Sequence, residues 1–191
     1  MMTLTLIEYQ RAALAAMLVA LLLAVGVTFV FIPNFELVTT TAFLTGYLMG
    51  PRWGWWVAGL GEALFSAINP IGSGLAFPVL FLFQILSIMF VAGVGSLFYR
   101  YQMAEQPGTG THIWLGVLGG GLTLIYDFLT ALSFPLTAGI GGWTLLTVAV
   151  LGLGFFIVHI VVNSLLFAMV LPHLMYLGRR QLMLHGILQH D

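Results

Sequence analysis

The chain has 191 residues, of which 61% are hydrophobic and only 6% are charged, and its mean hydropathy is +1.10. Soluble domains carry about 25% charged residues, so this composition excludes a water-facing domain and suits a surface that faces lipid. The net charge of −1 excludes a basic surface for nucleic acid, and without cysteine or lysine the chain has no disulfide, thiolate metal site or Walker A nucleotide site.

Six apolar segments follow one another, separated by prolines, glycines and short polar runs. Such residues end or kink helices. The sequence therefore predicts an all-α membrane protein with a single domain of six transmembrane helices. The expected spans are 12–31, 37–49, 55–68, 77–99, 113–134 and 143–177.

The first span follows Arg11 and could be confused with a signal peptide. No small-residue cleavage site comes after it, and its length of about 20 residues is long for the apolar region of such a peptide. We therefore expect a retained helix.

Alanines recur every four residues along this first span, at Ala12, Ala16, Ala20 and Ala24. This spacing places small side chains in a stripe on one helix face, which lets another helix approach closely. We expect a helix of a partner protein to dock there. Packing within the bundle is the alternative.

The second and third spans are short, because a perpendicular crossing needs about 20 residues. We expect neighbouring helices to shelter them in part, or an adjoining loop to dip into the membrane beside them. The sixth span is longer than a crossing requires, and we expect it to tilt or to kink near Pro172.

Five arginines define the expected topology, because basic residues concentrate in cytoplasmic segments. Six spans with both termini in the cytoplasm put all of them on one side, at Arg11, Arg52, Arg100, Arg179 and Arg180. The tryptophans that follow Arg52, at Trp53, Trp55 and Trp56, are interpreted as an aromatic belt at the membrane interface.

Ionisable residues inside a membrane are costly and are therefore functional candidates. The predicted spans contain Glu62, Asp127 and His159, with the neutral polar residues Gln84 and Asn163. Counted from the span ends, Glu62, Gln84 and Asp127 lie roughly 10 Å below the outer surface, and His159 and Asn163 lie deeper on one helix face. We expect these side chains to line a cavity that receives a small polar ligand from outside.

Other interpretations stay open at this point. Polar residues in helix bundles also form hydrogen bonds that only hold helices together, in which case the chain is a structural or assembly protein. The glycine-rich loop 69–74 and the loop 134–143 are either lids over a cavity or ordinary turns. Two carboxylates without a base beside them would suit a cationic or donor-rich ligand. Protonation of either carboxyl at that depth is the alternative, because burial raises the pKa of a carboxyl group. An intramembrane serine protease using Ser73 and His159 is disfavoured, because the two residues differ in depth.

Three motifs follow one another in the first half of the chain, at residues 32–38 (IPNFELV), 46–54 (GYLMGPRWG) and 69–72 (NPIG). Tyr126 and Asp127 in the fifth span and the stretch 159–172 in the sixth continue the series. With these motifs the chain resembles the substrate-binding S component of energy-coupling factor (ECF) vitamin transporters. The order and spacing of these motifs carry the likeness over nearly the whole chain.

The resemblance implies a six-helix subunit of a prokaryotic cytoplasmic membrane that captures a vitamin or similar micronutrient near the external face. It implies a membrane coupling subunit as partner, with two cytoplasmic ATPases that supply the ATP-driven step, and no cofactor or catalytic activity of the chain itself. Small residues on the first helix would contact the coupling subunit. The pocket candidates are Glu62, Asn69, Gln84, Tyr126, Asp127, His159 and Asn163.

Overall fold

The computed structural model describes residues 2–99 and 107–184, which form helices and turns with no β-strand among them. This confirms the all-α prediction for that part of the chain. The elements are α1 (Met2–Phe29), α2 (Val38–Met49), α3 (Gly54–Ile68), the short 3₁₀ helix η1 (Gly74–Ala76), α4 (Pro78–Leu97), α5 (Thr109–Ala131), α6 (Ser133–Thr137), α7 (Trp143–Met169) and α8 (Leu171–Leu184).

Three stretches of the described chain are long and apolar enough to cross a membrane, namely Glu8–Phe29, Pro78–Leu97 and Thr109–Thr137. A fourth results if Gly154–Met169 and Leu171–Leu184 form one span, bent by 42°. These helices indicate a membrane protein. The bend confirms the kink expected near Pro172, the second residue of α8, because a proline cannot continue the hydrogen bonding of the preceding turn.

Helix α2 has only 12 residues and lies inside the bundle, where every residue from Val38 to Leu48 is buried. Its neighbours are α1, α3, α4, α7 and α8. The expectation that this short segment is sheltered by other helices is therefore confirmed. A helix enclosed in this way needs no lipid-facing surface, so its threonines are tolerated at depth.

Two glycines set the distance between α2 and α4. A Cβ atom on Gly46 would lie 1.8 Å from the carbonyl oxygen of Ala92, and one on Gly95 would lie 2.2 Å from that of Phe43. Because both obstacles are backbone atoms, neither position admits a side chain without moving a helix. The central pair of helices therefore packs backbone against backbone, as small residues permit in membranes.

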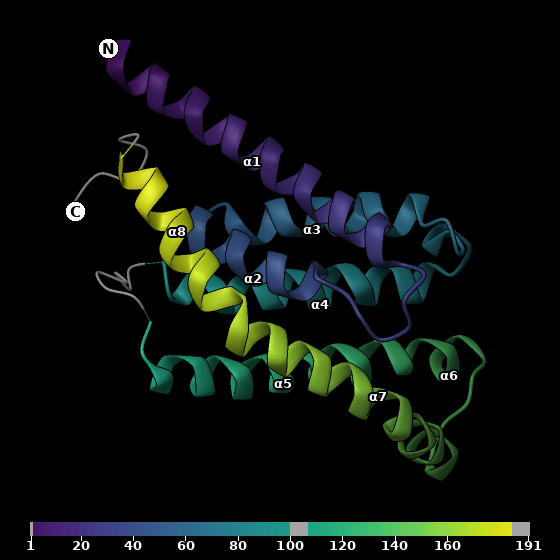
Figure 1. Cartoon of the computed structure of the whole chain (residues 1–191). Coiled ribbons are helices and arrows are strands. Elements are labelled where there is room, and N and C mark those ends of the chain that lie inside the picture. The colour runs from purple at the N-terminus through teal and green to yellow at the C-terminus, as the bar shows by residue number, and fades with distance from the viewer. Residues whose placement is uncertain (1, 100–106, 185–191) are drawn as a thin grey trace.

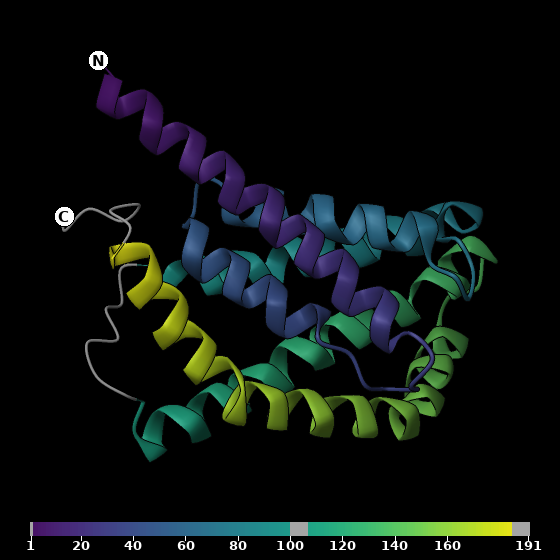
Figure 2. The ribbon, with the colours of Figure 1, turned by 45° about the horizontal axis from the view of Figure 1, so that its top comes forward.

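The N-terminal end of α1 and the C-terminal end of α8 lie at the same end of the bundle (Figures 1 and 2). The turns that join α1 to α2, α3 to α4 and α5 to α7 lie at the other end (Figure 1). Arg11 and Arg52 line one crevice at the terminal end. Arg179, from α8, donates a hydrogen bond to the carbonyl of Tyr99, just beyond α4. Arg100 lies outside the described residues.

The segment 134–143, expected to be either a lid or an ordinary turn, begins within the helix α6. Its side-chain hydroxyls at Ser133 and Thr137 donate to carbonyls one turn earlier, at 2.6 and 2.7 Å. This end of the bundle is therefore more regular than the sequence suggests.

Candidate functional site

A cavity of about 590 Å³ lies at the end of the bundle where these turns gather. Helices α1 to α7 and the segment 30–37 between α1 and α2 all contribute to its wall. The polar side chains that line it are Asn34, Glu36, Thr39, Glu62, Gln84, Tyr126, Asp127, Thr130, Ser133 and His159. A chain with so few ionisable groups thus collects most of its buried ones around one space.

Five of the seven predicted site residues line this cavity, namely Glu62, Gln84, Tyr126, Asp127 and His159. Asn69 and Asn163 are not in its wall. The Asn69 side-chain oxygen accepts a hydrogen bond at 2.9 Å from the backbone of Ile71, so it shapes the turn after α3. Asn163 is fully buried behind the cavity, where its amide nitrogen donates to Glu36 at 3.0 Å.

The central contact joins α5 to α7: Nδ1 of His159 lies 2.7 Å from Oδ1 of Asp127. The expectation that His159 lies deeper than Asp127 is therefore wrong. Depth was counted along each predicted span as if all spans stood parallel, whereas tilted helices bring residues with different counts to one level. The contact also means that Asp127 is not a carboxylate without a base beside it.

Glu36 belongs to the cavity wall, although the sequence analysis did not name it as a site residue. Its Oε2 atom accepts a hydrogen bond at 2.8 Å from the backbone nitrogen of Thr39, in the first turn of α2, where amide groups lack partners within the helix. Its Oε1 atom lies 3.5 Å from Nε2 of His159. An acidic residue next to the start of a predicted helix was the available signal, but its assignment to an external loop concealed it.

The charge state of Glu36 follows from these neighbours. Burial raises its pKa, but the contacts with His159 and Thr39 outweigh burial and leave the pKa below its ordinary value. Glu36 is therefore a carboxylate at neutral pH, and it holds the segment 30–37 against α7.

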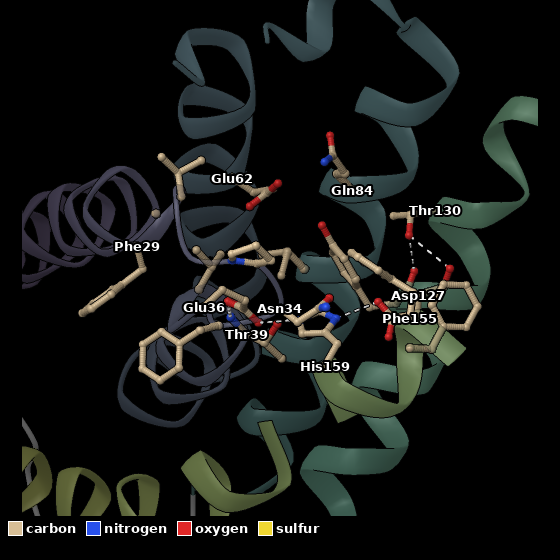
Figure 3. A pocket seen from close by; sticks show the side chains of 18 of the residues that line it. Phe29, Asn34, Glu36, Thr39, Glu62, Gln84, Asp127, Thr130, Phe155 and His159 are labelled. Atoms are coloured by element: carbon tan, nitrogen blue, oxygen red, sulfur yellow. Dashed lines mark hydrogen bonds and ion pairs between the residues drawn. The ribbon is translucent and has the colours of Figure 1, made fainter. Parts of the chain in front are cut away.

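On the opposite side of the cavity, Glu62 of α3 and Gln84 of α4 face the group formed by Glu36, His159 and Asp127 (Figure 3). The hydroxyl of Ser66 lies 2.7 Å from Oε1 of Glu62 and 3.2 Å from Oε1 of Gln84. Two groups of polar side chains, here called the two polar walls, thus face each other across the cavity.

Within the described residues, no group of three histidines or carboxylates is arranged to hold a metal ion. The hydroxyl of Ser73 donates to the carbonyl of Ala67 at 2.7 Å, in the turn after α3. Ser73 does not line the cavity that contains His159.

The four alanines of the stripe on α1, Ala12, Ala16, Ala20 and Ala24, are all exposed. The buried residues Leu18, Leu22 and Gly26 lie on the other face of α1, where Leu22 and Gly26 contact Gly61 and Phe65 of α3. Packing within the bundle therefore uses the face opposite the stripe.

No protein-family model, curated protein or solved structure matches the chain in comparisons with known proteins.

Replacing Glu36 by alanine tests the contacts around His159. We expect Glu36→Ala to lower the free energy of unfolding by about 1–3 kcal/mol, because Asn163 and the amide of Thr39 lose their acceptor while buried. We also expect faster hydrogen exchange of the amides of 30–37 in detergent. Glu8→Ala, at an exposed position on α1, is the matched control. Equal exchange in both variants would show that Glu36 does not hold the segment.

Proposed function

We propose that the chain is the substrate-capture subunit of an ECF-type importer in a prokaryotic cytoplasmic membrane. In this proposal it crosses the membrane six times, with both termini in the cytoplasm. It binds a vitamin or related micronutrient from the external side. A separate membrane coupling subunit and two ATPases then drive delivery, and the chain itself has no catalytic role.

The observation that carries this proposal is the cavity between two polar walls. Small-molecule pockets measure about 300–1,000 Å³ and combine apolar surface with a few placed polar groups. The cavity has about 590 Å³ and is lined by phenylalanines as well as by the polar residues named above. If these polar residues served only to hold helices together, we would expect them to contact one another directly, without a cavity between them.

The proposed orientation is supported by the described arginines. Arg11 and Arg52 line a crevice with Trp53, and Arg179 reaches the end of α4, so they gather at the end of the bundle away from the cavity. By the positive-inside rule that end faces the cytoplasm. The cavity then faces the outside, as uptake requires.

Six crossings fit the shelter given to α2. This helix of 12 residues and α3 of 15 are shorter than a perpendicular crossing needs, but α2 is enclosed by other helices, so the backbone at its ends can be buried in protein instead of facing lipid. The exposed alanine stripe supports the partner proposal, since its small side chains allow the helix of another protein to approach α1 closely.

A structural or assembly role is the second candidate, and one observation favours it. Asp127, His159, Glu36 and Asn163 bind one another across α5, α7 and the segment 30–37, as residues that only hold helices together would do. The two functions differ in whether a small molecule occupies the cavity.

A thermal-shift screen of the purified protein against water-soluble vitamins tests ligand capture. We expect at least one compound to raise the unfolding temperature, because a ligand that binds only the folded state stabilises it by mass action. Ala131 lies in the cavity wall, so Ala131→Phe fills part of the space and should remove the shift. A shift of equal size in that variant would place the binding elsewhere.

Co-purification tests the partner surface. We expect the tagged chain, expressed in a prokaryote together with an ECF coupling module, to retain the coupling subunit and ATPases, and Ala16→Leu to reduce this retention at least tenfold. The bulkier side chain separates helices that must pack closely. Ala138→Leu, an equally exposed position at the cavity end, is the control. Equal retention by both variants would refute the docking assignment.

A further inference from the structure

The wall of the cavity contains more acidic than basic groups. Glu36, Glu62 and Asp127 line it, and its described lining residues include no arginine. His159 is the sole basic side chain among those lining residues, so three acidic groups face one basic group. Inside walls of low dielectric constant, such an imbalance attracts positive charge and disfavours anions.

Two of these carboxylates already have partners within the protein. Asp127 and Glu36 contact the two ring nitrogens of His159, at 2.7 and 3.5 Å. Glu36 also accepts hydrogen bonds from Thr39 and Asn163. Their charges serve to connect α5, α7 and the segment 30–37.

Glu62 differs from both. It is only 2% exposed, it accepts one hydrogen bond from Ser66, and it forms no ion pair with any described residue. A carboxyl group withdrawn from water keeps its negative charge only where a positive group or several donors compensate it, and it otherwise holds its proton. Glu62 faces the open space of the cavity (Figure 3), so a bound molecule is placed to supply that compensation.

One oxygen of Asp127 also lacks a partner among the described residues. Oδ2 of Asp127 is buried and has no hydrogen-bond partner in the described part of the chain, whereas Oδ1 is taken by His159. Buried polar atoms nearly always have a partner. This oxygen is therefore an acceptor that no described side chain satisfies.

Aromatic side chains form a large part of the remaining wall. Phe29, Phe65, Phe155, Phe156 and Tyr126 are among the lining residues. The faces of such rings attract organic cations, by about 0.5–2 kcal/mol per contact, and they also pack against flat heterocycles. Aromatic rings beside an uncompensated carboxylate are a combination suited to a positively charged organic molecule.

We propose that the captured ligand is an organic cation built on a flat nitrogen heterocycle, and that Glu62 is its counter-ion. This inference rests on the proposed capture function and narrows its substrate class. Anionic micronutrients are excluded from the site by the same carboxylates that attract the cation.

Matched compounds that differ in charge and little in shape test the inference. The panel pairs 1-methylnicotinamide with nicotinamide and pyridoxamine with pyridoxine, and adds thiamine as a larger cation, riboflavin as a neutral compound, and biotin and pantothenate as anions. Calorimetric titration of the purified wild-type protein should show binding of cations, at least tenfold tighter than that of a neutral or anionic compound.

Two variants then test whether Glu62 is the counter-ion of the bound cation. We expect Glu62→Gln, which preserves the shape of the side chain, to weaken the binding of the preferred cation at least tenfold, while Glu8→Gln on the surface of α1 leaves it unchanged. Size-exclusion profiles establish that both variants are folded, and the wild-type charge comparison needs no variant. Unchanged cation binding by Glu62→Gln overturns the counter-ion assignment.

The remaining outcomes separate the two proposals. Tighter binding of a neutral or anionic compound overturns the cation inference and leaves the capture function standing. Binding of no compound by the wild-type protein contradicts the capture function itself, and the inference fails with it.

Discussion

His159 holds two carboxylates at once, and the cavity end of the bundle depends on this arrangement. Its ring nitrogens lie 2.7 Å from Asp127 and 3.5 Å from Glu36, which come from α5 and from the segment between α1 and α2. In a membrane, water is not available to satisfy these groups, so each must find a partner in the protein. The histidine thereby fixes α5, α7 and the segment 30–37 relative to one another, while Glu62 on the opposite wall forms no ion pair with any described residue.

The other end of the bundle is organised by close packing. Gly46 and Gly95 bring the backbones of α2 and α4 together, and α2 is enclosed on all sides. Arg179 is only 8% exposed and lies over the rings of Tyr47 and Tyr99. A cation held there by a carbonyl and two aromatic faces ties α8 to the bundle, so the cavity can remain open at one end while the other is closely packed.

The helices could be predicted from the sequence because their ends coincide with residues that no helix interior favours. Gly50 ends α2 with a positive φ of 76°, and Pro78 begins α4 at a position where its missing N–H is harmless. The burial of α2 and the bend before α8 also followed from segment lengths. In the last third of the chain, one expected span divides into α7 and α8 at the bend beside Pro172.

The site could be predicted in part, because placing a charged group inside a membrane costs free energy. Glu62, Asp127 and His159 were identifiable because ionisable groups are rare in apolar helices. Their pairing was not, since the separation of Asp127 and His159 by 32 residues reveals nothing about helix tilt. Glu36 was missed because a loop that folds back into a cavity has no periodicity to mark it. Asn163 was identified as polar and buried, but whether it faced the cavity or Glu36 depended on helix rotation.

Everything proposed for this chain requires a small molecule to fill the space between the two polar walls. Native mass spectrometry of the protein released gently from prokaryotic membranes can detect such a molecule. We expect a complex of one chain with one positively charged organic molecule of a size that fits about 590 Å³, and its loss on mild collisional activation. A spectrum that contains only the bare chain, or the chain with variable numbers of lipids, would contradict it.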